Sequence, residues 1–292
     1  MRYTALAIIA AFAILSAQSP SGPTFDVVSI KKHVREPGPA GLSSNVSQRP
    51  DGGLTMTNVP VTTLIARAYA GFRPADYVGL PDWARSEYFD VSATSTLTQV
   101  TADDRAAMMR TMLADRFKFV AHIEKRSQEV YDLLVSRSDG KLGAGLTPID
   151  TDCAPVIAAQ REAFLLGSTP PGPPQRPDLN APPPPCTLRS VRGRNDPSDR
   201  LEGEATMAAL AEFFWMSAGR PVVDKTGLPG SYRVKMNFDL FGSRRGPEVV
   251  PPPDAAPTVF TAVREQLGLK LDAARAELDA LIIDRLERPT EN

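Results

Sequence analysis

The chain has 292 residues, of which 42% are hydrophobic and 23% are charged, and its formal net charge is −1. This is enough apolar material for one large domain or two domains of ordinary size. The balanced charge excludes a protein that relies on a basic excess to grip nucleic acid or a membrane surface.

The first residues have the pattern of a secretory signal peptide. Arg2 supplies a positive charge, and the apolar run from Ala5 to Leu15 is too short to span a bilayer comfortably. We expect a signal peptide over residues 1–18 with cleavage near Ala17 or Gln18. The mature chain is then expected to be secreted or periplasmic and to have no transmembrane segment. Because Leu15 is a poor residue at its position before the cleavage site, an uncleaved N-terminal anchor is the alternative.

Residues 24–137 are expected to form a first unit of strands and helices. The patterns of "FDVVSIKK", "GGLTMTNV" and "EYFDVSA" predict strands, and "FKFVAHIE" and "EVYDLLVS" are expected to pair with each other. One helix is predicted from Pro60 to Gly71, and another follows Thr101, which has Asp104 three residues later as in a capping box. We interpret the methionines of this second helix as core filling.

Residues 138–199 are expected to form a proline-rich linker without a packed core, because "TPPGPPQRPDLNAPPPPC" favours polyproline structure. Cys153 and Cys186 lie in this segment and are the two cysteines of the chain. An oxidising compartment favours a disulfide between them. Two free thiols or a nucleophilic cysteine are the alternative, although neither cysteine has a histidine nearby in the sequence.

Residues 200–288 are expected to form a second unit of the same kind. "LEGEA" predicts a strand, and Thr206 caps a helix that ends at Gly219. "SYRVKMNFDL" alternates as an antiparallel strand with one face on the core. Thr258 opens a last helix that ends at Gly268, and "LKLDAA" and "LDALIIDRL" close the unit as a strand pair.

The two units share more than their order of elements. Gly79-Leu80-Pro81 precedes Phe89-Asp90-Val91 in the first unit, and Gly227-Leu228-Pro229 precedes Phe238-Asp239-Leu240 in the second. We therefore predict an α+β fold of two related strand–helix–strand–strand–helix–strand–strand units with antiparallel or mixed sheets. The units are interpreted as a duplication, joined by the proline-rich loop.

Two motif matches suggest chemistry. D-K-T-G, which begins at Asp224, is also the phosphorylation motif of cation pumps, but this sequence has neither the nucleotide domain nor the membrane helices of a pump. Ser29 and Lys32 fit S-x-x-K, residues 43–45 fit S-x-N and Lys225 begins K-T-G, which is the order in penicillin-recognising enzymes. The serine of S-x-x-K should open a helix, whereas residues three apart in a strand face opposite sides. A hydrolase that uses Ser29, Lys32 and Lys225 is kept as an alternative.

A structural role accounts for D-K-T-G better. Asp224 and Thr226 are suited to hydrogen-bond the local backbone, while Gly227 and the Pro-Gly pair after it turn the chain into the alternating strand. We keep Asp224, Lys225 and Thr226 as a candidate interaction surface.

Other catalytic signals are weak. The sequence has no G-x-S-x-G or H-E-x-x-H motif, and its histidines, His33 and His122, lack metal-ligand spacing. Asp82, Glu87 and Asp90 are spaced acids near a turn, as is usual on a solvated surface, with a carboxylate pair for glycoside chemistry as the alternative. We predict no catalytic residue, no metal site and no cofactor.

Four stretches carry a resemblance: "FDVVSIK", "LADRFKFVAHIEKRSQEVYDLLV", "GRPVVDKTGLPGSY" and "LIIDRLERPTEN". They resemble an uncharacterised family of secreted proteins from soil bacteria, of the Solibacter or acidobacterial type. The chain departs from that family in its proline-rich insert and in the basic "RVK" after Tyr232. The resemblance implies no known activity and no catalytic residues.

Some members of that family are joined to membrane-embedded zinc peptidases, a domain that this sequence lacks. The units also resemble, more loosely, the N-terminal signalling domains of secretins and outer-membrane transporters, which bind partner proteins. We therefore expect an extracytoplasmic protein that binds envelope proteins without catalysis and has no nucleic-acid partner. The alternatives are the envelope hydrolase and a sensor module that works with a separate membrane peptidase. The sequence does not identify a small-molecule ligand.

Overall fold

The computed structural model describes residues 22–34, 44–49, 51–73, 76–97, 99–167, 181–192, 198–240 and 256–289. The expected signal peptide at 1–18 and most of the proline-rich stretch "TPPGPPQRPDLNAPPPPC" lie outside the described residues. The described chain has six helices and twelve strands in three mainly antiparallel sheets, so the predicted α+β class is confirmed.

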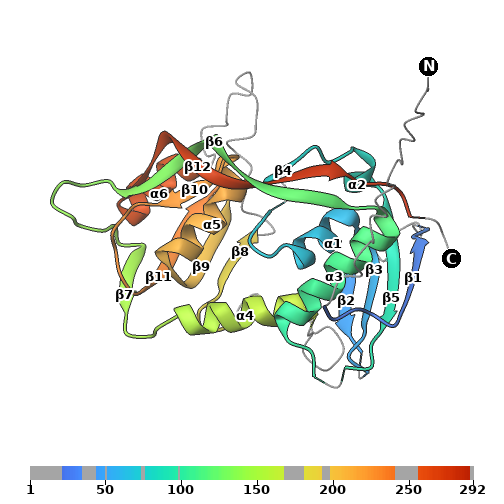
Figure 1. Ribbon diagram of the computed structural model, residues 1–292. Helices are drawn as coiled ribbons and strands as arrows, with labels where there is room; N and C mark the ends of the chain where they lie inside the picture. Colours follow the sequence, from blue (N-terminus) through green and yellow to red (C-terminus); the bar gives the residue numbers. More distant parts are fainter. Residues whose placement is uncertain are drawn as a thin grey trace, which may run out of the picture.

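The N lobe is built on a four-stranded sheet with the order β1-β5-β3-β2 (Figure 1). Its strands are β1 (Val27–Lys32), β2 (Asn45–Gln48), β3 (Leu54–Pro60) and β5 (Tyr88–Thr94). Its helices are α1 (Val61–Ala68), the short α2 (Trp83–Ser86) and α3 (Ala102–Phe117). Thr101 and Asp104 accept hydrogen bonds from each other's backbone N–H, so the predicted capping box is present. The methionines of α3 fill the interior as predicted, since Met108, Met109 and Met112 are buried.

The C lobe has a second four-stranded sheet with the order β7-β11-β9-β8. Its strands are β7 (Leu146–Ile149), β8 (Leu188–Arg192), β9 (Asp199–Thr206) and β11 (Ser231–Phe238). Its core helices are α5 (Met207–Ala218) and α6 (Val259–Leu267). Thr206 and Thr258 cap these helices by accepting from backbone N–H groups three residues on, as predicted. Both helices end at the predicted glycines, Gly219 and Gly268, which adopt the left-handed conformation.

A long two-stranded ribbon runs from one lobe to the other along the top of Figure 1. It consists of β6 (Val120–Val135) and β12 (Leu269–Arg285), which pair antiparallel along nearly their whole lengths. The short strands β4 (Tyr77–Val78) and β10 (Val222–Asp224) extend this sheet in parallel, β4 beside β12 and β10 beside β6. The third sheet therefore has the order β10-β6-β12-β4.

Each end of the ribbon belongs to a different core. Leu281 of β12 is buried in the core of the N lobe, although it lies near the C-terminal end of the chain. Leu133 of β6, which continues from the N lobe, is buried in the core of the C lobe. The two lobes thus exchange strands, and each core is completed by a segment that follows from the opposite lobe.

The ribbon differs from the expected strand pairs at the end of each unit. Phe117 is the last residue of α3. From Val120 on, "FKFVAHIE" and "EVYDLLVS" form the single strand β6, and "LKLDAA" and "LDALIIDRL" form the single strand β12 as far as Arg285. The residues between them, Lys125–Gln128 and Arg275–Glu277, include no glycine, proline or asparagine that would favour a reversal of the chain. Each strand therefore continues straight and finds its partner in the other unit.

The two lobe sheets correspond strand by strand, because β1, β5, β3 and β2 take the same places as β7, β11, β9 and β8. The two Gly-Leu-Pro stretches also correspond: each follows a short parallel strand, and Gly79 and Gly227 both have positive φ angles of 82° and 67°. The Phe-Asp matches do not correspond, since Phe89 pairs near the end of β3 and Phe238 near the start of β9. The duplication itself stays a prediction.

The segment expected to be a linker is more structured than its sequence indicated. It contains β7, β8 and the helix α4 (Ala154–Leu166). No residue of α4 is buried, and its apolar residues are spread around the helix, so its sequence shows no distinct apolar stripe that would reveal it. This helix lies across both lobes in Figure 1 and becomes important for the candidate site.

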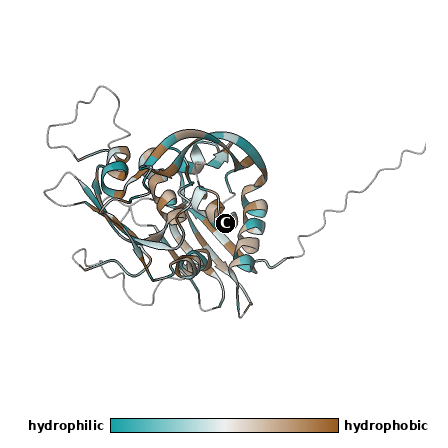
Figure 2. Cartoon of the chain, turned by 90° about the vertical axis from the view of Figure 1, so that its left-hand side faces the viewer, coloured by the Kyte–Doolittle hydropathy of each residue, from teal (hydrophilic) through white to brown (hydrophobic). Residues whose placement is uncertain are grey.

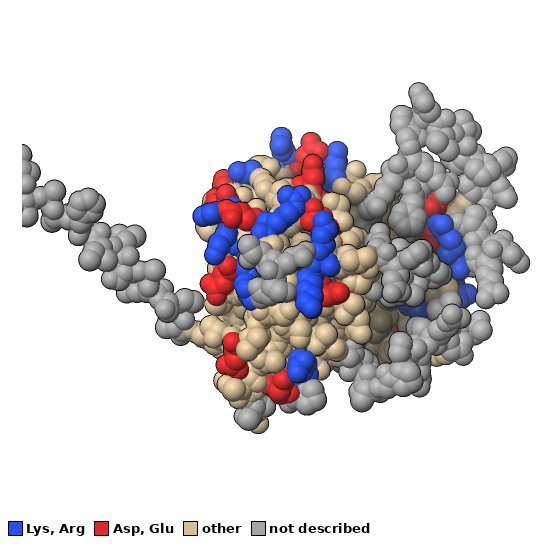
Figure 3. Space-filling view, turned by 90° about the vertical axis from the view of Figure 1, so that its right-hand side faces the viewer, with Lys and Arg blue, Asp and Glu red and all other residues tan. Residues whose placement is uncertain are grey.

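The surface mixes both signs of charge. On the face of the N lobe in Figure 3, Lys and Arg side chains are interspersed with Asp and Glu. Polar and apolar residues follow one another along the strands in Figure 2, and in β11 buried and exposed residues alternate from Tyr232 to Phe238 as predicted. Among the helices in the described ranges, none is long and apolar enough to cross a membrane.

The shared ribbon predicts that the lobes unfold together. Trp83 lies in the N lobe and Trp215 in the C lobe, so the variants W215F and W83F each leave one fluorescent reporter. We expect the same urea midpoint from both reporters. Leu281→Ala, which removes a fully buried side chain at a cost of about 2–5 kcal/mol, should lower both midpoints equally. Leu133→Ala should do the same from the other lobe, and a shift seen by only one reporter would contradict the shared ribbon.

Candidate functional site

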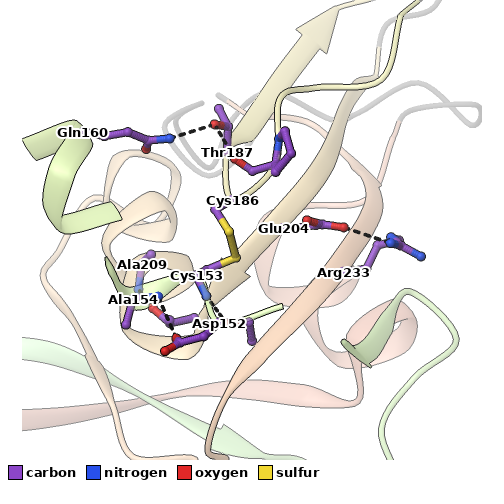
Figure 4. The surroundings of a disulfide bond; sticks show 12 residues. Asp152, Cys153, Ala154, Gln160, Cys186, Thr187, Glu204, Ala209 and Arg233 are labelled. Carbon is purple, nitrogen blue, oxygen red and sulfur yellow. Dashed lines mark hydrogen bonds and ion pairs between the residues drawn. A yellow bond between two sulfur atoms is a disulfide. The ribbon is translucent and has the colours of Figure 1, made fainter. Parts of the chain in front are cut away.

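The helix α4 is attached to the C lobe at its N-terminal end. Cys153 is the residue before its first turn and forms the predicted disulfide with Cys186, which precedes β8 (Figure 4). The backbone N–H of Cys153 also donates to Ser231 Oγ of β11 at 2.9 Å. Gln160 of α4 donates to Thr187 Oγ1 at 3.3 Å, one residue after the disulfide. These contacts fix the beginning of α4 on the sheet of the C lobe.

The other end of α4 is attached to the N lobe. Gly167 ends the helix, and its carbonyl accepts a hydrogen bond from the backbone of Gln48 in β2 at 2.9 Å. Arg67 of α1 donates to the carbonyl of Phe164 and stacks on the Phe164 ring at 4.3 Å from its centroid. A positive charge at a helix C-terminus is favourable, so Arg67 stabilises this end.

Arg67 remains charged at neutral pH despite its burial. Burial of its guanidinium, together with the nearby charge of Arg105, lowers the pKa of Arg67 to about 10. Arg105 is itself fully buried, and it donates to the carbonyl of Gly52 at 2.9 Å. The C-terminal end of α4 is thus held by the charged guanidinium of Arg67, which is buried in the N lobe.

The helix α4 covers a groove between the lobes, which we call the α4 groove. It consists of two hollows that adjoin each other, since Arg73 and Glu212 line both. The larger hollow, of about 400 Å³, lies between α4 and α5. The smaller, of about 270 Å³, lies between α4 and the segment after α1. The main lining side chains of the first are Arg73, Ile157, Gln160, Leu188, Glu212, Phe213 and Trp215. The main ones of the second are Phe72, Arg73, Arg161, Phe164, Leu165 and Glu212.

Arg73 connects the two lobes across this groove. Its backbone N–H and its Nε–H both donate hydrogen bonds to Asp76 Oδ2, at 2.8 and 3.3 Å. Asp76 is only 6% exposed. The guanidinium of Arg73 lies 4.7 Å from the ring centroid of Trp215 on α5. A cation from the N lobe is therefore held over an aromatic ring of the C lobe.

The residues predicted as an interaction surface lie elsewhere, at the end of β10. Asp224 Oδ1 accepts from the backbone N–H of Thr226 at 2.9 Å and from its hydroxyl at 2.7 Å. Thr226 Oγ1 accepts in turn from Leu228 N–H at 3.2 Å, while the side chain of Lys225 is exposed. These bonds form the predicted turn, and none of the three residues lines the α4 groove.

The hydrolase alternative placed Ser29, Lys32 and Lys225 in one site, and the structure does not bring them together. Ser29 and Lys32 lie on β1 at the outer edge of the N lobe, whereas Lys225 follows β10 beside β6 in another sheet (Figure 1). Lys32 Nζ is 3.3 Å from Glu87. Of the S-x-N match, Ser43 lies outside the described residues, and Ser44 donates to the carbonyl of Asn58 at 2.6 Å.

Two of the three acids near the turn, Glu87 and Asp90, have side-chain partners. Glu87 accepts from Arg288 at 2.8 Å, and this hydrogen bond holds the pKa of the Glu87 carboxyl below its usual value. Asp90 lies 2.8 Å from His33 Nδ1, and His122, which is exposed, lies 2.9 Å from Asp284. Within the described ranges the single cluster of metal-ligating atoms includes both cysteine sulfurs, which the disulfide occupies.

Sequence reasoning missed the α4 groove because its walls come from distant segments. Arg73 and Trp215 are separated by about half of the chain, and α4 was not predicted. One signal was present: Phe213 and Trp215 flank the buried Phe214 on α5, and a single core-facing stripe does not accommodate all three aromatic side chains. Two surplus aromatic side chains on a helix indicate a second covered surface.

The fold and the site define a two-lobed α+β protein with a groove between its lobes. The chain belongs to a family of proteins of unknown function, DUF3738, which matches residues 62–286. This range includes the ribbon, α4 and every named side chain of the groove. The predicted resemblance to a family without an established activity is confirmed at this level. A search of curated proteins finds no match, and a search of solved structures finds none either.

Removal of the disulfide is expected to destabilise the protein strongly. The bond spans 33 residues, and a loop of that size contributes about 3–4 kcal/mol in the chain-entropy account. Urea unfolding of the C153A/C186A variant should show a loss of this size, equal to that of the reduced wild-type chain. A loss below about 1 kcal/mol would mean that the bond does not constrain the unfolded chain.

The turn after β10 predicts different effects for neighbouring residues. Asp224→Ala removes two hydrogen bonds and should cost about 1–2 kcal/mol of unfolding free energy. Lys225→Ala, at an exposed side chain next to it, should change stability by less than about 0.5 kcal/mol. Equal effects of the two substitutions in urea unfolding would contradict the structural role of Asp224.

Proposed function

We propose that the protein is an extracytoplasmic binding module of the cell envelope, which holds a ligand or partner segment in the α4 groove without chemical turnover. The observation that carries this proposal is the groove itself. Binding sites are typically concave and mostly apolar, contain a few placed polar groups, and often lie between domains. The α4 groove has aromatic and aliphatic walls, a fixed arginine at its centre and one wall from each lobe.

The location outside the cytoplasm is supported by three independent features. The chain has a disulfide between Cys153 and Cys186, and disulfides form and persist in oxidising compartments but are rare in the cytoplasm. The N-terminal residues have the pattern of a signal peptide, which leads to the periplasm or the exterior if cleaved and to an anchored protein if retained. The sequence also resembles secreted proteins of soil bacteria, whose partners would be other proteins of the envelope.

Binding is favoured over hydrolysis by the chemistry of the groove. Its central side chains are an arginine paired with Asp76 and the aromatic rings of Phe213 and Trp215, which suit recognition. The residues of the hydrolase alternative are spread over two sheets. The groove therefore gives the binding role a physical site.

The proposal predicts saturable binding of a neutral apolar probe. In the W83F variant, Trp215 is the remaining tryptophan, and it should transfer energy to N-phenyl-1-naphthylamine as this probe fills the groove. Ile157→Asp places a charge in the groove wall and should weaken binding about tenfold or more. Val156→Asp is the matched control, because Val156 is the exposed neighbour on α4 and does not line the groove.

Three results would remove the proposal. One is the absence of saturable energy transfer from Trp215 in W83F. Another is equal transfer from Trp83 in the W215F variant, since Trp83 lies in the N lobe away from the groove lining. The last is an equal loss of affinity in Ile157→Asp and Val156→Asp.

A further inference from the structure

A cation and an anion meet at the junction of the two hollows of the α4 groove. Arg73 and Glu212 are the two charged residues that line both of them. We propose that the groove binds a zwitterionic ligand with an apolar side chain, of which a free apolar α-amino acid is the simplest form. This inference rests on the binding function proposed above and adds the chemical class of the ligand.

Arg73 is prepared to bind a carboxylate. Its guanidinium carries five N–H donors, and the interaction with Asp76 uses only the one on Nε. Within the described chain, the terminal Nη1 and Nη2 groups of Arg73 have no hydrogen-bond partner. The buried Asp76 on one side and Trp215 on the other hold the guanidinium in place before a ligand arrives. A fixed planar guanidinium with two free amino groups matches the geometry of a carboxylate.

Glu212 supplies the opposite charge. It lies on α5, its side chain is exposed at the rim of the groove, and it forms no ion pair with another described residue. The other glutamate near the larger hollow, Glu204, is already paired with Arg233 at 2.8 Å. Glu212 is therefore the carboxylate left to receive an ammonium group.

The space between these charges is apolar. Ile157 of α4, Leu188 of β8 and Phe213 of α5 line the larger hollow, whose volume of about 400 Å³ falls within the range of small-molecule sites. An aromatic or branched side chain fits this wall, with its α-carboxylate toward Arg73 and its α-ammonium toward Glu212. All three parts of an apolar amino acid thus find a complementary group.

The test compares L-phenylalanine with two analogues that each lack one charge. Isothermal titration of the full chain should show binding of L-phenylalanine. L-phenylalaninamide and N-acetyl-L-phenylalanine should each bind about tenfold more weakly, because each leaves one protein charge without its partner. Arg73→Gln should abolish the preference for the acid over the amide, and Glu212→Gln the preference for the free amine over the acetylated form.

Two further variants separate charge from structure. Arg73→Lys keeps a positive charge beside Asp76 but lacks the planar fork, so it should retain the fold and lose most of the preference for the acid. Arg264→Gln removes the same charge from an exposed position on α6 that does not line the groove, and it should keep both preferences. Thermal unfolding of each variant verifies that the fold is intact.

The outcomes distinguish this inference from the binding function on which it rests. The zwitterion would be overturned, and the apolar groove retained, if N-phenyl-1-naphthylamine still binds but L-phenylalanine does not. The same holds if both analogues bind as tightly as L-phenylalanine. The peptides Gly-Gly-Phe and Phe-Gly-Gly test the source of the ligand. If Gly-Gly-Phe binds more tightly than L-phenylalanine, the ligand is a peptide C-terminus and the role of Glu212 is overturned. Weaker binding of both peptides supports a free amino acid.

Discussion

The pairing of β6 with β12 is the constraint on which the rest of the structure depends. The ladder runs from Leu269 opposite Val135 to Arg285 opposite Val120, and its two ends lie in different cores. A shift of register by one residue would turn the apolar side chains at both ends away from their cores. The burial of Leu133 and Leu281 therefore fixes the ribbon, and the ribbon fixes how the lobes face each other.

The α4 groove exists because of that fixed arrangement. One wall comes from the segment after α1, one from α5, and the roof is a helix with no buried residue of its own. Such a helix contributes little apolar burial and stays in place through its ends, the disulfide at Cys153 and the guanidinium of Arg67. The floor of the groove can thus be rigid while its roof is held at two points. Arg73 links the two lobes within this groove, since it belongs to the N lobe and stacks on the Trp215 ring of the C lobe.

Local features of the fold could be predicted from the sequence, and features that depend on distant partners could not. Thr101, Thr206 and Thr258 were recognised as helix caps because capping is settled within four residues, and the alternation of β11 revealed a half-buried strand. The continuity of β6 and β12 was missed because their partners lie in opposite units. Of the candidate site, the disulfide was predicted, but α4 has no apolar stripe, and the approach of Arg73 to Trp215 is decided only by tertiary packing.

The exchange of strands also determines when folding can finish. The core of the N lobe needs Leu281, and β4 near residue 77 needs β12 as its neighbour, so neither is complete until almost the entire chain is available. Pairings between such distant residues form slowly, because the chain must close a very long loop before it gains the contact. The N lobe of a polypeptide with this topology therefore lacks part of its core until the synthesis is almost finished. For a chain that crosses a membrane before it folds, as the proposed location requires, that delay keeps it in a form that the translocation machinery can thread.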